Sequence, residues 1–309
     1  MNYLDFQKKI MFYGQYQPPV VIRISLNEDT GKRVEIVDYH QDNFPINWGD
    51  GTIDSSNFHD YAEYGDYDIE IQGTIGGDIS GRFFSDRTAP TVIAAYFNEP
   101  GLLKEYAFRG CTNLSYVQLS RMPEETSIPL GAFLDSGIVN YTLHSGIVSI
   151  GDSAFNGCTR FVDGDLLYVQ TIGMSAFKGC TRILEANGES LEEIGEEAYA
   201  NCTNLRTVDF HNVKTIGIGA FKNSGLTSIT IPYGVTEVPD YMCYNCNNMT
   251  VAYLPESITR IGMRAFYTTS WEEVPIDTME IYFGGTRAKW ESIEKGTYWG
   301  NRTVHCIDD

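Results

Sequence analysis

The chain has 309 residues, of which 42% are apolar and 20% are charged, a composition typical of an ordinary soluble protein rather than a disordered one. Its formal net charge of −19 argues against nucleic acid as a partner, because phosphate binding needs clustered Lys and Arg. The same charge disfavours docking onto an anionic membrane surface. A basic partner, a cation and a neutral sugar remain compatible with it.

The chain shows no sign of membrane insertion. No run approaches the roughly 18 consecutive apolar residues that a membrane span requires. Lys8 and Lys9 are followed by four apolar residues before Gly14, which is too short for the apolar region of a signal peptide. We therefore expect neither a signal peptide nor a transmembrane segment in this sequence.

The first part of the chain is predicted to be an arm followed by a small β-sandwich. Residues 1–19 form the arm, which ends at two prolines. From Val20 to Leu26 apolar residues alternate with their neighbours, and turn residues interrupt this and later apolar runs. Period-two apolar runs separated by turns favour antiparallel strands, here over residues 20–75.

A turn within this region carries a family resemblance. Trp-Gly-Asp-Gly-Thr at residues 48–52, followed by His59-Asp60-Tyr61 and a strand over 65–71, resembles the PKD-like, immunoglobulin-type domain. The resemblance implies a spacer or a contact module without catalysis. Asp50, Asp54 and Asp60 could be calcium ligands, but we favour a purely structural turn and expect no metal site.

A six-residue motif, Ile-Gly-x-x-Ala-Phe, dominates the second half of the chain. Its alanine position stands at residues 154, 176, 198 and 220, a period of 22. A fixed period in this range indicates a solenoid, in which each coil buries its apolar face against its neighbours. Weaker copies extend the array to eight coils, from the alanine position at 107 to the one at 265.

Within a coil, the pattern separates inward from outward positions. Residues two apart on a strand share a face, so Val208 and Phe210 point inward while Thr207 and Asp209 point outward. The inward set that starts from Cys202 is Leu205, Val208, Phe210, Val213 and Ile216, and the set that starts from Cys180 is Ile183, Ala186, Gly188, Leu191 and Ile194.

Five of the seven cysteines occupy one repeat position. Cys111, Cys158, Cys180, Cys202 and Cys246 lie four residues after the alanine position, where two other coils have Ser136 and Ser224. A site that alternates Cys with Ser is small and buried, and stacked coils about 4.8 Å apart exceed the ~3.8 Å Cβ separation of a disulfide. We predict reduced thiols. The Cys243-x-x-Cys246 pair follows the repeat register, so neither redox chemistry nor zinc binding is expected.

The repeat unit Ile-Gly-x-x-Ala-Phe-x-Gly/Asn-Cys-x-x-Leu, with proline-bearing strands such as 229–232 and 253–255, resembles the BspA-type leucine-rich repeat over residues 91–283. This implies a mainly β chain with short helices, a right-handed leucine-rich-repeat solenoid preceded by a small β-sandwich. The predicted divisions are an arm (1–19), a PKD-like β-sandwich (20–75), a linker (76–90), the repeats (91–278) and a C-terminal cap (279–309).

Single coils depart from the repeat. Met242-Cys243 replaces Ala-Phe, and Gly164, Ala186 and Gly188 are expected to leave their coils poorly filled. In the cap we expect a strand at 279–283, a helix at 286–293 that carries Trp290, and a last strand at 303–307.

The sequence offers no catalytic constellation and one candidate binding surface. No hydrolase, nucleotide-binding or metalloprotease motif occurs, and the five histidines are scattered, so we expect no enzyme and no cofactor. The outward strand positions place four carboxylates mid-array and tyrosines at both ends. The candidate ligand-binding residues are Tyr116, Asp163, Asp165, Glu185, Asp209 and Tyr253. The alternative is a hydrated acidic face that only keeps the array in solution.

These observations favour a non-catalytic recognition or adhesion protein that presents the solenoid surface to a protein or glycan on a cell surface. The BspA-type resemblance implies a bacterial cell surface as its location. The alternative is a structural or receptor-binding protein of a phage or prophage tail, with other virion proteins as partners and residues 1–19 as an assembly arm.

Overall fold

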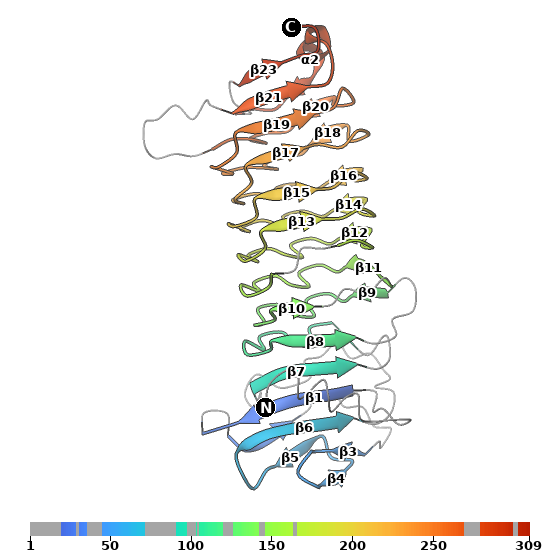
Figure 1. Ribbon diagram of the computed structural model, residues 1–309, viewed down its shortest axis with the longest axis vertical. Helices are drawn as coiled ribbons and strands as arrows, with labels where there is room; N and C mark the ends of the chain where they lie inside the picture. The colour runs from blue at the N-terminus through green and yellow to red at the C-terminus, as the bar shows by residue number, and fades with distance from the viewer. Residues whose placement is uncertain are drawn as a thin grey trace.

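The structure is an elongated stack of strands, with β3 and β4 at one end and the C-terminal residues at the other (Figure 1). This computed structural model describes residues 20–28, 31–35, 45–71, 91–97, 103, 105–119, 126–141, 146–162, 166–268, 279–298 and 302–309. The predicted arm at 1–19 and the predicted linker at 76–90 lie outside these residues. Their boundaries stay predictions.

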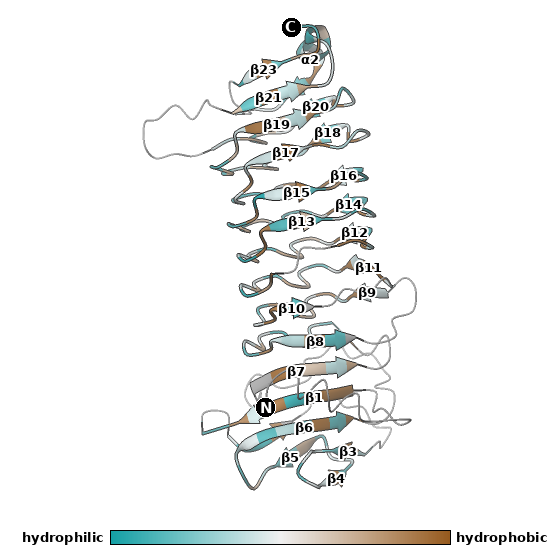
Figure 2. Ribbon diagram, viewed as in Figure 1, coloured by the Kyte–Doolittle hydropathy of each residue, from teal (hydrophilic) through white to brown (hydrophobic). Residues whose placement is uncertain are grey.

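Antiparallel strands form the N-terminal end of the stack. β1 pairs with β6 in a register that sets Ile22 opposite Ile69, and both side chains are buried. Strand alternation explains why apolar residues of β1 enter the core, and Figure 2 shows β1 as mostly hydrophobic. The strands of this region are β1 (Val20–Leu26), β2 (Arg33–Glu35), β3 (Ile46–Asn47), β4 (Ile53–Asp54), β5 (Phe58–Asp60) and β6 (Gly65–Ile71).

β7 (Thr91–Phe97) joins the N-terminal strands to the coils. It pairs antiparallel with β1 on one side and parallel with β8 (Tyr116–Leu119) on the other. A seven-stranded sheet with the order β10-β8-β7-β1-β6-β3-β4 results. One apolar cluster runs from Val20 to Ile293, so the N-terminal strands and the array share a continuous interior.

Each coil contributes a strand to one or both of two parallel ribbons. The first ribbon continues from β8 through β10 (Asn140–Tyr141), β13 (Glu185–Asn187), β15 (Thr207–Asp209), β17 (Ser228–Thr230), β19 (Val251–Leu254), β21 (Glu280–Phe283) and β23 (Thr303–His305). The second ribbon comprises β9 (Thr126–Ile128), β11 (Ile147–Ile150), β12 (Thr171–Ile172), β14 (Glu193–Ile194), β16 (Thr215–Ile216), β18 (Glu237–Val238), β20 (Arg260–Ile261) and β22 (Glu294–Lys295). Ile150 pairs with Ile172 and Ile172 with Ile194, which confirms the 22-residue register.

The Ala-Phe segments form tight turns on the third side of the coil. They contain i to i−3 hydrogen bonds, such as Ala176 N–H to the Gly173 carbonyl at 3.3 Å. The glycine of Ile-Gly is required by close approach of neighbouring coils, because a Cβ on Gly195 would lie 2.6 Å from the Gly173 carbonyl carbon. Consecutive coils are tied by bonds such as Phe155 N–H to the Ala176 carbonyl at 2.8 Å.

Two internal ladders, one of stacked aromatic rings and one of cysteine thiols, fill the array. The ring centroids of Phe155 and Phe177 are 5.3 Å apart and those of Phe177 and Tyr199 are 5.2 Å apart, with the rings nearly parallel. The thiols are free, as predicted, and Cys180 and Cys202 each donate to the carbonyl of a Phe in the preceding coil at 3.1 Å. The inward positions predicted from Cys180 and from Cys202 are confirmed as buried or half-buried.

The expectation that Gly188 leaves its coil poorly filled is wrong. A Cβ at Gly188 would lie 2.9 Å from Leu191 Cβ and 3.6 Å from Phe210 Cδ1, so neighbouring side chains already occupy the space. Gly164 lies outside the described residues. Met242 and Cys243 are both buried, so they replace Ala and Phe without leaving the core.

The last residues extend both ribbons and close them. The predicted strand at β21, the last strand at β23 and the helix α2 (Arg287–Ser292) are present, and Trp290 of α2 packs on Phe283 at 5.4 Å between ring centroids. Arg302 Nη2 donates to the Phe266 carbonyl at 2.8 Å. In earlier coils a cysteine thiol donates to the equivalent Phe carbonyl. The Arg302 guanidinium therefore satisfies the last of these Phe carbonyls.

Candidate functional site

The outward side of the first ribbon carries most of the sequence-predicted site residues. Glu185 and Asp209 are exposed on the adjacent strands β13 and β15 but are offset by two residues, because Asn187 stands opposite Asp209. Tyr253 of β19 keeps 46% of its surface exposed. Tyr116 is half-buried at the start of β8, near the other end of the ribbon. Asp163 and Asp165 lie outside the described residues, so the clustering of four carboxylates stays a prediction.

Two adjoining depressions follow the carboxyl ends of the first-ribbon strands. One, of about 340 Å³, extends from Val208 to Tyr233, and the other, of about 470 Å³, extends from Thr230 to Ile307. They share Thr230 and Ile231. We call the two together the ribbon-edge groove. It brings Asp209 and Tyr253 onto one continuous surface, whereas Tyr116 and Glu185 do not line it.

An aromatic stack forms one wall of the groove. The ring centroids of Tyr253 and Tyr282 are 5.4 Å apart, and those of Tyr282 and His305 are 4.6 Å apart, with interplanar angles of 26° and 18°. Tyr282 is 39% exposed. Sequence reasoning missed Tyr282 and His305 because it treated residues 279–309 as a cap outside the ribbon. The signal was present, since both continue the outward position of Tyr253, but the spacing had left the 22-residue period.

Carboxylates contact both ends of the groove. Tyr282 donates its hydroxyl hydrogen bond to Glu280 at 2.8 Å, and this contact raises the pKa of Tyr282. Glu280 Oε2 also lies 3.6 Å from His305 Nε2. At the other end Asp209 Oδ1 lies 2.6 Å from His211 Nδ1. The described residues that line the groove include neither Lys nor Arg.

The buried thiols of Cys158 and Cys202 are unsuited to nucleophilic chemistry. Burial raises the pKa of Cys158 and of Cys202 to about 12, so both are protonated at neutral pH. Among the described residues, one group has metal-ligand spacing, Cys306 with Asp308 and Asp309. Asp309 already accepts from the Cys306 N–H at 2.6 Å and pairs with Arg287, so its carboxylate serves the end of the chain.

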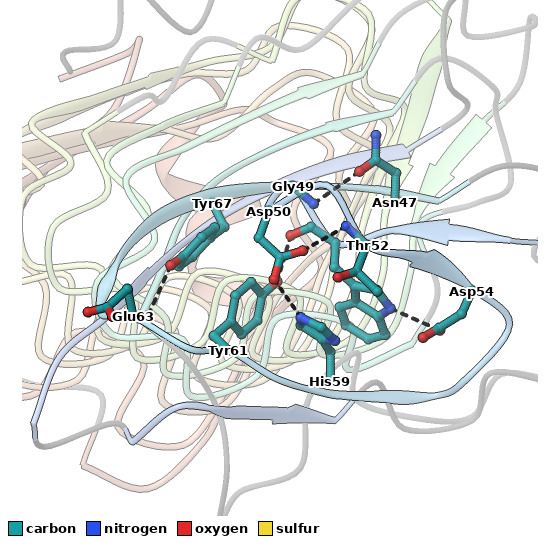
Figure 3. A network of polar contacts seen from close by, with 10 residues as sticks. Asn47, Gly49, Asp50, Thr52, Asp54, His59, Tyr61, Glu63 and Tyr67 are labelled. Atoms are coloured by element: carbon teal, nitrogen blue, oxygen red, sulfur yellow. Dashed lines mark hydrogen bonds and ion pairs between the residues drawn. The ribbon is translucent and has the colours of Figure 1, made fainter.

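The Trp-Gly-Asp-Gly-Thr turn uses its carboxylates internally (Figure 3). Asp50 accepts from the Thr52 N–H at 2.9 Å and lies 2.8 Å from His59 Nε2. Asp54 accepts from Trp48 Nε1 at 3.1 Å. These contacts favour the structural interpretation of the turn over a calcium site.

Stacked coils, parallel ribbons and an internal ladder of Phe and Cys define a repeat solenoid. The model of the BspA type leucine rich repeat region matches residues 97–188 and 170–284, in six copies and over more than half of the chain. The chain belongs to this family. No curated protein matches the sequence.

Several solved structures are similar to this chain. A leucine rich cell surface protein from Faecalibacterium prausnitzii A2-165 is 21% identical, with a TM-score of 0.44 over 65% of this chain and 62% of that chain. A leucine rich repeat protein of T. pallidum is 26% identical, with a TM-score of 0.39 over 55% and 72% of the two chains. A leucine-rich repeat protein from Bacteroides ovatus is 20% identical, with a TM-score of 0.44 over 84% and 67%. The match thus spans less than two thirds of the Faecalibacterium chain.

In the part of the chain that the structure describes, no helix has the length and apolar character that crossing a bilayer requires.

Proposed function

We propose that this protein is a non-catalytic recognition or adhesion protein that presents the first ribbon to a protein or glycan on a cell surface. One observation carries the proposal: the ribbon-edge groove joins Asp209 and Tyr253, two residues selected from the sequence for their outward positions, on one surface. The repeat side chains on the inside are occupied by packing. Variation that could serve recognition is therefore confined to the outside.

The family supports this proposal. BspA-type leucine-rich repeats are typical of non-enzymatic surface proteins, and we place the chain on a bacterial cell surface for that reason. The family match begins at residue 97, so the PKD-like assignment of residues 20–75 rests on the turn at 48–52 and its neighbours. We propose that this module acts as a spacer. No observation favours the phage-tail alternative.

The candidate site comprises Asp163, Asp165, Glu185 and Asp209 in the middle of the ribbon, with Tyr116 and Tyr253 toward its ends. Stacked carboxylates repel one another unless a basic group lies among them, which favours a ligand-contact role. A hydrated acidic face is the competing interpretation. The ligand-contact role predicts that reversing the charges affects binding, whereas the hydrated acidic face predicts that it does not.

Charge reversal on the two ribbons tests the proposal. Fluorescently labelled protein would be measured on a panel of cultured cells by flow cytometry and on arrays of extracellular-matrix proteins and glycans. Asp163→Lys with Asp209→Lys should abolish binding. Glu193→Lys with Glu294→Lys makes the same charge change at exposed positions of the second ribbon and should leave binding intact.

Thermal melts followed by circular dichroism would establish that both double variants fold. If the wild type binds nothing on cells or arrays, or if Asp163→Lys with Asp209→Lys binds as the wild type does, the first ribbon is not the recognition surface.

A further inference from the structure

We propose that the ribbon-edge groove binds an extended segment of a partner protein in which basic side chains alternate with apolar ones. This rests on the proposed function, in which the first ribbon is the recognition surface. It adds the chemistry of the ligand and moves the centre of the site from the middle of the array to its C-terminal third.

The dimensions of the groove suit a short extended segment. The two depressions, of about 340 and 470 Å³, follow the strands from β15 to β23. Four steps between stacked strands at about 4.8 Å span roughly 19 Å. An extended chain rises about 3.3 Å per residue, so about six residues would cross the groove.

The floor of the groove is apolar in the larger, C-terminal depression, whereas polar and apolar atoms mix in the smaller one. The floor is formed by core side chains whose outer atoms reach the surface, among them Phe210, Ile231 and Leu254. Tyr233, 78% exposed, lines the smaller depression after β17, and Ile307, 69% exposed, stands at the C-terminal end of the groove. Apolar side chains of an occupant would cover this surface, which gains free energy from the area removed from water.

The charges around the groove favour a basic occupant. The side chains of Asp209 and Glu280 are 64% and 47% exposed. Arg287, close to the C-terminal end, is already engaged by Asp309 and by the Val304 carbonyl. The described lining residues include no Lys or Arg, and the chain carries a net charge of −19, so Lys or Arg side chains of a partner supply the missing complement.

The stacked rings favour a basic peptide over a sugar. Tyr253, Tyr282 and His305 lie face against face, so the faces between them are covered, and the Tyr282 hydroxyl already donates to Glu280. A pyranose ring stacks on an open aromatic face, which Tyr282, the inner ring of this stack, does not offer.

Fluorescence anisotropy with three labelled eight-residue peptides tests this inference. The peptides alternate Leu with Lys, with Gln or with Glu, and otherwise match. The Lys peptide should bind the full chain at least tenfold more tightly than the Gln peptide, and the Glu peptide should not bind. The affinity of the Lys peptide should fall as salt rises from 50 to 500 mM, because ion pairs of exposed groups are screened.

Matched variants localise the binding. Asp209→Asn with Glu280→Gln should weaken the Lys peptide at least tenfold, and Tyr282→Ala should weaken both the Lys and the Gln peptides. Glu193→Gln with Glu294→Gln removes the same two charges from the second ribbon and should leave affinity unchanged. Thermal melts verify folding. Asp209→Asn alone tests the loss of one charge while the Glu280–Tyr282 hydrogen bond stays intact.

Four results would overturn the inference: equal binding of the three peptides, no binding of the Lys peptide, equal weakening by the second-ribbon variant, or competition by a neutral oligosaccharide at the groove. Self-association by sedimentation that Tyr282→Ala removes would instead assign the groove to a second copy of the chain. If cell binding depends on the first ribbon while the peptides fail, only this inference falls. If cell binding also ignores the ribbon, the proposed function falls with it.

Discussion

The N-terminal strands and the coils are stabilised by different kinds of contact, although they share a sheet. In the N-terminal strands, single polar contacts stand out, such as the buried pair in which Arg23 donates to both oxygens of Asp68 at 2.7 and 2.8 Å. In the coils the same contact recurs in several turns, such as a cysteine thiol on a phenylalanine carbonyl at 3.1 Å for Cys180, Cys202 and Cys246. One region depends on particular residues, and the other depends on a periodic pattern.

This difference has consequences for stability. In a repeat array each coil contacts only its neighbours, so a defect removes nearest-neighbour interactions. A buried ion pair has no neighbouring copy, and losing one partner leaves the other charge in the interior. Substitutions in the two regions should therefore differ in size and in pH dependence.

The largest effect is expected from a break in the ring ladder. Phe177→Ala opens a cavity between Phe155 and Tyr199, and truncation of a buried Phe costs about 3–5 kcal/mol. The free energy of unfolding from urea titration measures it. Met174→Ala, in the same coil but half exposed, should change the free energy by less than about 0.5 kcal/mol. An unchanged midpoint for Phe177→Ala would contradict the coil register.

The corresponding break in the N-terminal strands is Asp68→Ala. Removing one member of a buried ion pair costs 3–5 kcal/mol, and we expect about 3 because both side chains keep a few per cent of their surface in water. Asp66→Ala, two residues earlier on β6 and exposed, is the matched control. Equal urea midpoints for the two variants would show that the Arg23–Asp68 contact does not stabilise this region.

The Trp-Gly-Asp-Gly-Thr turn should make the N-terminal strands sensitive to acid. Burial opposes ionisation of Asp50, but hydrogen bonds from His59 and Thr52 outweigh it and hold the pKa of Asp50 below its ordinary value of 3.8. A carboxyl with a lowered pKa stabilises the fold above its unfolded pKa, and this contribution is lost as pH falls through the folded pKa.

Asp50→Asn should therefore cost about 1 kcal/mol at pH 7 and progressively less from pH 4 to pH 2. Urea titrations of both proteins at several pH values measure the difference. A difference that stays constant with pH would exclude the proposed role of the ionised carboxylate.

In the coils, one substitution should stabilise. The Tyr199 hydroxyl is buried in the ring ladder without a hydrogen-bond partner, and a buried unsatisfied group costs about 1–3 kcal/mol. Tyr199→Phe should raise the free energy of unfolding by about 1 kcal/mol. Phe221→Tyr puts a hydroxyl on the next ring of the ladder and should lower it by a similar amount. A loss of stability in Tyr199→Phe would mean that the hydroxyl is satisfied in solution.

The periodic part of the molecule could be predicted from the sequence because each inference was repeated. The alignment of Ile150, Ile172 and Ile194 fixed the register, and the cysteine position fixed the inward direction. The filling around Gly188 was not predicted, since it depends on how Leu191 of the same coil and Phe210 of the next coil pack together. The groove was also missed, because Tyr282 and His305 join Tyr253 only through strand pairing that the 22-residue period no longer describes. The proposed recognition surface of this chain thus lies where the pattern stops repeating.

The smallest effect is expected at the cysteine ladder, where the pattern itself supplies the tolerated substitution. Ser136 and Ser224 occupy the position of Cys202 in other coils, and Ser224 Oγ lies 3.2 Å from Cys246 Sγ. A serine at 202 can donate to the Phe177 carbonyl as the thiol does, so Cys202→Ser should cost under about 1 kcal/mol. Cys202→Leu adds volume to the same closed site and should cost about 1–3 kcal/mol. If both variants lost the same free energy of unfolding, the hydrogen bond that Cys202→Ser retains would contribute nothing to stability.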